Sequence, residues 1–214
     1  DLHSFPTRRS SDLEPYAVAI LENHAPYQFI DDETGEYRGI AVDILNDVSQ
    51  KTGLQFNFVL VKSWDELFQL INEDSIQIVA EMPYDYSFAA ERELTMTRSY
   101  ASSPYVLLAR TGFQGPHSGQ RLALTNVSSY SDGYYVGDVS RYSSMEDCIE
   151  AVQSDEADYT YVDLYTAQYF MGESRYKSME LIPQSYTPRS ICFGIAKPTS
   201  HELLSILNKS INQL

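Results

Sequence analysis

The sequence predicts an α/β protein of two similar lobes, on the basis of an internal repeat and of an alternation of strands with helices. Residues 63–72 align without a gap with residues 144–153, and the match continues into strands expected at 76–80 and 157–162. Two α/β lobes built on one plan usually face each other across a cleft, and such clefts bind small ligands. The repeat therefore favours a two-lobed binding protein.

Each copy of the repeat opens with a serine and carries an acid three residues later, Ser63 with Glu66 and Ser144 with Asp147. This spacing is that of a capping box, in which the two side chains satisfy amide groups at the start of a helix. The apolar residues that follow recur at helical spacing, so each helix is expected to bury one face. They are Leu67, Leu70 and Ile71 in the first copy, and Cys148, Ala151 and Val152 in the second.

The first half of the chain begins with an apolar run at 16–21, which indicates a buried strand. Residues 40–50 follow a helical pattern that Gly53 ends. Apolar and polar side chains alternate at 54–60, which predicts a strand with one buried face. The first copy of the repeat comes next. Strands that alternate with helices in this way are typical of a parallel sheet.

The second half opens with an apolar strand at 105–110, and a further strand is expected at 122–125. Ser128 and Ser129 then open a short helix, and the second copy of the repeat follows. The expected elements beyond it are a helix near 164–170, a strand at 190–196 and a helix at 200–214 that runs to the last residue.

Composition argues against nucleic acid as a partner. Lys and Arg total 15 against 30 Asp and Glu, so the net charge is −15 and a row of phosphates could not be neutralised. Cys148 and Cys192 lie among apolar neighbours and are expected as buried free thiols rather than as a disulfide. No stretch approaches the ~20 apolar residues that a membrane-spanning helix needs.

Five motifs, taken in order, carry a resemblance to a known family. They are Ala-Pro-Tyr-Gln-Phe at 25–29, Gly-Ile-Ala-Val-Asp-Ile-Leu at 39–45, Trp-Asp-Glu-Leu at 64–67, the strand and turn at 122–130, and Ala-Asp-Tyr-Thr-Tyr-Val-Asp at 157–163. Together they resemble the bacterial extracellular solute-binding proteins of family 3, over residues 16–214. That family includes periplasmic amino-acid-binding proteins and the Venus-flytrap sensor domains of membrane-bound kinases and cyclases.

The resemblance implies a periplasmic-binding-protein-like fold of type II, with two α/β lobes joined by a hinge around a central cleft. Lobe 1 is expected at 14–100 and lobe 2 at 101–197, with hinge crossings near 100–105 and 195–198. Residues 198–214 are expected to form a helix that returns toward lobe 1 and is cut off by the end of the chain. Residues 1–13 resemble a translated sequencing adapter, so they are taken as a non-native, disordered leader and left out of the fold.

The second lobe supplies three candidate ligand contacts. Ser128 and Ser129 lie where a strand gives way to a helix, and free amides there suit a ligand carboxylate. The alternative is an ordinary helix cap. Asp163 ends a strand at the carboxyl edge where α/β sheets bind ligands. By the resemblance it pairs with a ligand ammonium, and its alternative role is again a helix N-cap.

The first lobe supplies the other candidates. The resemblance implies that His24 and Trp64 line the ligand pocket, although a Trp at the start of a helix often packs in the core instead. Tyr27, from the first motif, is a further candidate. Met82 and Tyr84 follow the first-lobe strand and are candidates by their position.

Two residues depart from the pattern of members that bind free amino acids. Those members carry small residues after the first-lobe strand, then an Arg that forks onto the ligand carboxylate. Here Glu81 stands where a small residue is expected, and Arg92 reaches the Arg position only if an insertion is allowed. If Arg92 does not face the cleft, Glu81 and Asp163 make the cleft acidic and favour a cationic ligand.

The function expected from the sequence is a domain, outside the cytoplasm, that closes on an amino acid or related amine for ABC-type uptake through a membrane permease. The alternative is the sensor module of a membrane-bound kinase or diguanylate cyclase. A dehydratase-like enzyme on the same fold is a remote third. No catalytic residue, cofactor or metal ligand is expected, because the chain has no nucleophile elbow, phosphate loop or zinc spacing.

Overall fold

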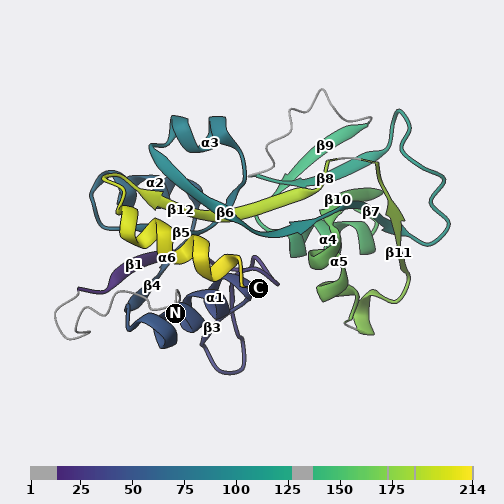
Figure 1. Cartoon of the computed structure of the whole chain (residues 1–214). Helices are drawn as coiled ribbons and strands as arrows, with labels where there is room; N and C mark the ends of the chain where they lie inside the picture. The colour runs from purple at the N-terminus through teal and green to yellow at the C-terminus, as the bar shows by residue number, and fades with distance from the viewer. Residues whose placement is uncertain (1–13, 127–136, 173, 186, 214) are drawn as a thin grey trace. The chain divides into compact units, whose positions relative to one another are not determined.

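The computed structural model describes residues 14–126, 137–172, 174–185 and 187–213, and these form two compact units (Figure 1). Unit 1 comprises the described residues up to Glu22, Tyr27–Ser102 and those from Ser190 onward. Unit 2 comprises Asn23–Pro26 and Ser103–Arg189. Unit 1 resumes at Ser190, earlier than the crossing predicted near 195–198, because the strand that begins with Arg189 belongs to the sheet of unit 1. The expected leader, 1–13, lies outside the described residues.

Unit 1 is built on one five-stranded sheet with the strand order β4-β1-β5-β12-β6. Strand β1 pairs in parallel with β4 and β5, and β12 pairs antiparallel with β5. The strands are β1 (Tyr16–Leu21), β4 (Phe56–Val61), β5 (Ile78–Pro83), β6 (Leu94–Ser103) and β12 (Arg189–Ala196), and a separate small sheet holds β2 (Phe29–Ile30) and β3 (Tyr37–Arg38).

Helices cover both faces of this sheet because successive strand residues point to opposite faces. Val18 and Ile20 of β1 pack in the cluster that includes α1 (Ile40–Thr52) and α6 (His201–Ile211). Ala19 and Leu21 pack in the cluster that includes α2 (Trp64–Asn72) and α3 (Tyr86–Glu91). Helix α6 ends at Ile211 with Asn212 as its C-cap, so the prediction that it runs to the last residue is wrong.

Unit 2 repeats this plan with a five-stranded sheet of order β11-β7-β10-β8-β9. Strand β8 pairs in parallel with β9 and β10, and β7 pairs antiparallel with β10. The strands are β7 (Tyr105–Arg110), β8 (Arg121–Thr125), β9 (Asp138–Tyr142), β10 (Tyr159–Asp163) and β11 (Met179–Pro183); the helices are α4 (Met145–Gln153), α5 (Leu164–Met171) and the 3₁₀ helix η3 (Ser174–Tyr176).

The internal repeat predicted from the sequence is present in both units. Reading the second sheet from β9 to β11 gives the same succession as β4 to β6 in the first, three parallel strands and then an antiparallel one. The match extends to the backbone between helix and strand, where Asp74 has φ 57° and Asp155 has φ 67°. Each copy therefore turns from helix to strand through a left-handed residue.

The helix caps follow the prediction with one difference. In α4, Ser144 and Asp147 form the complete capping box. In α2, Ser63 accepts from the backbone of Glu66, but the Glu66 carboxylate accepts from Lys62 N at 2.7 Å rather than from Ser63 N. Both caps satisfy amides that the first turn of a helix leaves without partners.

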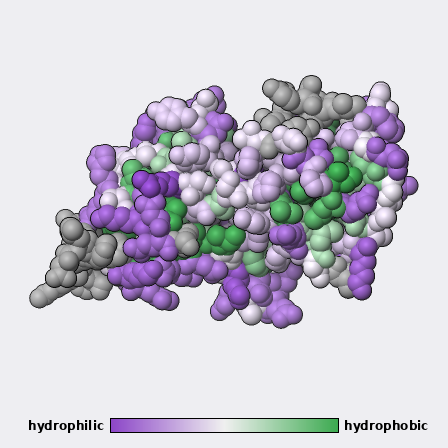
Figure 2. Space-filling view, turned by 45° about the vertical axis from the view of Figure 1, so that its right-hand side comes forward, coloured by the Kyte–Doolittle hydropathy of each residue, from purple (hydrophilic) through white to green (hydrophobic). Residues whose placement is uncertain are grey.

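The two cysteines are free and buried, as predicted, Cys148 in α4 and Cys192 in β12. None of the helices in the described ranges is long and apolar enough to cross a membrane. The face drawn in Figure 2 is mostly hydrophilic, with smaller apolar patches.

Candidate functional site

The parallel strands of both units place polar side chains at their carboxyl ends, which is where open α/β sheets bind ligands. In unit 1, Trp64 begins the helix that follows β4, and Glu81 lies near the end of β5. In unit 2, Asp163 is the last residue of β10. The sequence-predicted residues Trp64, Glu81 and Asp163 therefore all lie at carboxyl edges of their own sheets.

Glu81 is a buried carboxylate, only 3% exposed. The Gln28 side chain donates from Nε2 to Glu81 Oε2 at 3.0 Å, and Gln28 Oε1 accepts from Leu21 N at 3.0 Å. Gln28 is itself buried, so the amide connects the end of β1 to the end of β5. Buried polar groups need such partners because their transfer out of water is costly. Sequence reasoning missed Gln28, although it lies inside the motif at 25–29.

Asp163 is 4% exposed and caps helix α5. Its Oδ1 accepts from Thr166 N at 3.2 Å, and its Oδ2 accepts from Thr166 Oγ1 at 2.7 Å. Arg189 adds an ion pair, with Nη1 at 3.3 Å from Oδ2. The N-cap role that the sequence left open is thus confirmed, while the ligand contact stays a prediction. Nothing in the sequence pointed to Arg189.

Arg92 is the C-cap residue of α3, and its guanidinium has partners within unit 1. Nη1 donates to Phe88 O at 3.2 Å and pairs with Glu91 Oε2 at 3.2 Å. The guanidinium carbon also lies 3.9 Å from the centre of the Phe88 ring and 5.0 Å from that of Phe68. A cation over an aromatic face is attracted to it. These contacts give the predicted carboxylate clamp no support.

Trp64 joins the same aromatic cluster. Its ring centre lies 5.6 Å from that of Phe68 and 5.7 Å from that of Phe88, the second contact being edge-on. Its Nε1 is buried and has no hydrogen-bond partner among the described residues. The packing supports the core alternative for Trp64, although a buried indole N–H usually finds an acceptor.

The remaining candidates have different surroundings. Met82 is fully buried in the cluster that holds β5 and α2, and Tyr27 is 1% exposed. Tyr84 is exposed, and its backbone N donates to Ser190 O at 2.8 Å. His24 is half-buried and belongs to the short segment of unit 2 at Asn23–Pro26. Ser128 and Ser129 lie outside the described residues.

Other kinds of site find less support in the described part of the chain. No group of three or more His, Cys, Asp and Glu residues there is placed to hold a metal ion. A cavity of about 200 Å³ in unit 2 lies at the opposite, amino ends of β8 and β10, and is lined by Arg110, Thr111, Gly112, Phe113, Gln120 and Asp158.

The comparisons with known proteins agree with this architecture. The model of the family described as bacterial extracellular solute-binding proteins, family 3, matches residues 16–214. The periplasmic VFT2 domain of BvgS from Bordetella pertussis has a TM-score of 0.80 at 20% identity, over 93% of this chain and 87% of that one. No curated protein matches the chain.

Two further structures represent the sensor and the binding-protein branches. A histidine kinase sensor domain with similarity to periplasmic binding proteins has a TM-score of 0.76 at 18% identity, over 94% of this chain and 90% of that one. The arginine-bound form of truncated ArgBP from T. maritima has a TM-score of 0.76 at 17% identity, over 92% and 95%. These likenesses confirm the periplasmic-binding-protein-like fold predicted from the sequence.

Proposed function

Because the chain belongs to the bacterial extracellular solute-binding proteins of family 3, we propose that it is a ligand-binding domain that acts outside the cytoplasm. It closes on a small polar solute, an amino acid or a related amine, and presents that solute to a membrane permease for ABC-type uptake. Closure is a hinge motion that ligand contacts bias toward one state.

The observation that supports binding is the buried carboxylate at the carboxyl edge of each sheet. Glu81 in unit 1 and Asp163 in unit 2 are 3% and 4% exposed. Burying a carboxylate costs stability unless partners compensate, so such groups are rarely buried without a structural or functional role. Their position at the edges where α/β sheets bind ligands supports a role in recognising a polar ligand.

A thermal unfolding series tests this function. The melting temperature of the chain is recorded with single amino acids, polyamines, organic acids and short peptides. A ligand at about a hundred times its Kd adds ~2.7 kcal/mol to the free energy of unfolding. In a protein of this size that stabilisation raises the melting temperature by roughly 5–10 °C. A protein that melts cooperatively and responds to none of these solutes would contradict the proposal.

A sensor module is the second candidate, and the position of Arg92 favours it. The guanidinium packs on Phe88 and hydrogen-bonds Phe88 O, an arrangement that gives a free amino acid no carboxylate clamp there. The structures of BvgS and of the histidine kinase sensor domain represent such modules. The neighbouring coding sequence separates the two functions. A membrane span and a kinase or cyclase encoded after residue 214 would favour sensing, whereas an adjacent permease gene would favour uptake.

A further inference from the structure

Asp163 and Arg189 form an ion pair whose two members differ in exposure. The Asp163 side chain is 4% exposed, whereas that of Arg189 is 28% exposed. Both residues belong to unit 2, and the pair lies at the carboxyl end of β10. A solute that reaches this part of the sheet edge therefore meets the cation of the pair more readily than the anion.

The Asp163 carboxylate is already occupied. Oδ1 accepts from Thr166 N, and Oδ2 accepts from both Thr166 Oγ1 and Arg189 Nη1. A ligand ammonium would have to displace or share Arg189 before it could reach Oδ2. Separating a largely buried carboxylate from its cation is unfavourable, so the guanidinium acts as an internal competitor of amines.

The chemistry of Arg189 suits the opposite kind of ligand group. A guanidinium presents its N–H donors in a planar fork that matches a carboxylate in a bidentate arrangement. The bond to Asp163 limits how the fork can rotate, and an ordered donor loses less entropy on binding. Arg92, the arginine that the sequence offered for this task, instead packs on Phe88 and Phe68.

We propose that Arg189 is the specificity-determining cation of unit 2, which binds a carboxylate of the ligand while Asp163 holds it in place. The inference rests on the proposed function and narrows it. The ligand is a small carboxylate, such as an amino acid or an organic acid, and not an amine that lacks a carboxylate.

The test compares the wild-type chain with Arg189→Gln, and uses Arg175→Gln as a matched control. Arg175 also belongs to unit 2 and pairs with carboxylates, those of Glu146 and Glu150, which lie on α4. The probes are L-glutamate, L-arginine, glutarate, which lacks an amine, and putrescine, which lacks a carboxylate. Melting temperatures are followed by calorimetric titration of each probe that raises them.

The expected result is that at least one carboxylate raises the melting temperature of the wild type and of Arg175→Gln, and that putrescine does not. Arg189→Gln should then bind that carboxylate about 10- to 100-fold more weakly, the loss expected for a charge-assisted hydrogen bond. If Arg189→Gln does not fold, Arg189→Lys decides, because an ammonium keeps the charge but cannot form the bidentate contact. The Arg189→Lys variant should therefore bind the carboxylate more weakly than the wild type does.

Three results would overturn the inference. The first is that Arg189→Gln binds the carboxylate as tightly as the wild type does. Where Arg189→Gln does not fold, the same result in Arg189→Lys would count in its place. The second is that the affinity for the carboxylate falls as far in the control Arg175→Gln as in the Arg189 variant. Putrescine could stabilise the wild type while the carboxylates do not, in which case solute binding stands and only the role of Arg189 falls. A wild type that responds to no probe and to none of the wider solute series would remove both proposals.

Discussion

Gln77 in unit 1 and Asp158 in unit 2 occupy the same place in the internal repeat and make the same contacts. Gln77 Oε1 accepts from Ala17 N at 2.8 Å, and Asp158 Oδ2 accepts from Arg121 N at 2.7 Å. The backbone N of each donates in return to the carbonyl of the same partner, at 3.0 Å and 2.7 Å. Each side chain thus links the starts of two neighbouring parallel strands by hydrogen bonds, β5 and β1 in unit 1 and β10 and β8 in unit 2.

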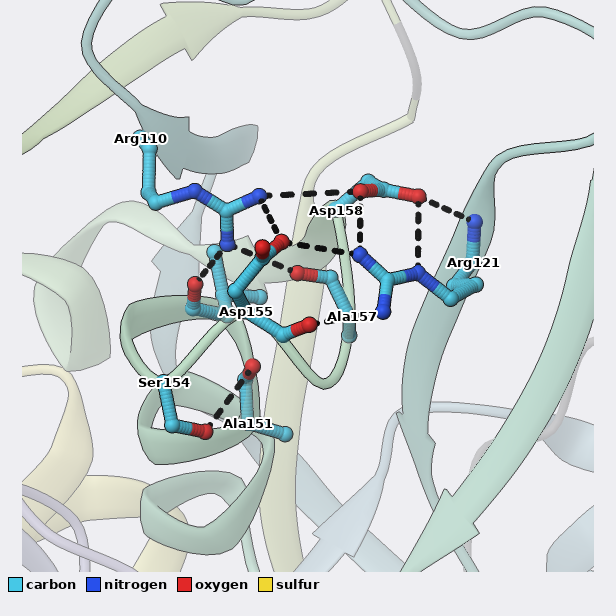
Figure 3. Close-up of polar contacts among 8 residues, drawn as sticks. Arg110, Arg121, Ala151, Ser154, Asp155, Ala157 and Asp158 are labelled. Carbon is cyan, nitrogen blue, oxygen red and sulfur yellow. Dashed lines mark hydrogen bonds and ion pairs between the residues drawn. The ribbon is translucent and has the colours of Figure 1, made fainter.

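The Asp158 carboxylate also takes part in an ion-pair network, which the neutral amide of Gln77 could not do. Arg121 reaches Asp158 Oδ1 at 2.8 Å, and Asp155 accepts from Arg121 at 2.9 Å and from Arg110 at 2.7 Å (Figure 3). The Arg121 guanidinium, by hydrogen-bonding to it, holds the pKa of the Asp158 carboxyl below its ordinary value. The network joins the turn after α4 to the starts of β8 and β10 and the end of β7.

Asp158→Asn keeps an acceptor for Arg121 N and removes the negative charge. We expect the free energy of unfolding to fall by about 1 kcal/mol, since partly exposed ion pairs contribute little individually and somewhat more in a network. Urea denaturation at pH 7 measures the change. The control is Asp32→Asn in the exposed β2–β3 turn, which should leave the midpoint unchanged. Equal midpoints for Asp158→Asn and the wild type would show that the network does not stabilise the fold.

The difference in stability between the wild type and Asp158→Asn should depend on pH. The folded-state pKa of Asp158 is lowered by the Arg121 hydrogen bonds, so its contribution to stability is complete above the unfolded-state pKa of about 3.9. The contribution is lost as the pH falls through the folded-state pKa. Urea midpoints from pH 7 to pH 3 should therefore show a constant difference between wild type and Asp158→Asn that shrinks below about pH 4. A difference that grows on acidification would contradict the sign of this shift.

Both thiols should be unreactive in the folded protein. Burial raises the pKa of Cys148 and that of Cys192 to about 12, so almost no thiolate is present at pH 8. We expect an aromatic disulfide reagent to label neither thiol rapidly in the native chain, and to label both after denaturation in urea. The unfolded sample is the internal control, and rapid labelling of either thiol without denaturant would contradict the prediction.

Gly39 should tolerate no side chain, because it lets the start of α1 approach the segment that holds Gln28. Its φ is 117°, and a Cβ would lie 2.5 Å from Tyr27 O. We expect Gly39→Ala to lower the free energy of unfolding by about 1–3 kcal/mol or more, from overpacking and backbone strain together. Gly35→Ala is the matched control, since Gly35 has φ 71° and open space around it. Equal losses in the two variants would show that contact with Tyr27 is unimportant.

Asp163→Ala and Asp85→Ala separate the two structural roles of Asp163. Asp85 caps α3 through a bond from Phe88 N to Oδ1 at 2.8 Å, and among the described residues no Arg forms an ion pair with it. Loss of that cap should cost about 1 kcal/mol. Asp163→Ala loses a cap and also removes the ion pair between Asp163 and Arg189, so we expect a loss of about 1.5–3 kcal/mol. Chemical denaturation of both variants measures the difference, and equal losses would mean that the Arg189 pair adds no stability.

Sequence reasoning missed the short strands β2 and β3 and three longer strands, and these three share one position. Strands β6, β9 and β11 are each at an edge of a five-stranded sheet. Strand β6 carries Ser and Thr through most of its length, and only the second residue of β9 is strongly apolar. An edge strand pairs on one side only and buries less surface, so its sequence carries a weak apolar pattern. Pairing with a neighbour, which the local pattern does not record, fixes such a strand.

Among the site residues, too, local features could be predicted from the sequence and long-range contacts could not. The sequence indicated that Glu81 and Asp163 lie at the carboxyl ends of strands, because strand and cap signals are local. It did not indicate that Gln28 would hold Glu81, that Arg189 would pair with Asp163 or that Arg92 would pack on Phe88. The first two contacts join residues 53 and 26 positions apart.

The sequence by itself therefore determined the two-lobed α/β plan, the repeated cap, helix and strand, the family and the buried thiols. These features follow from spacing over a few residues, where backbone geometry decides which side chains share a face. Only the tertiary structure decided which charge compensates which. The partner of a buried charge is whichever group the folded chain brings within a few ångströms, and no local pattern records that distance.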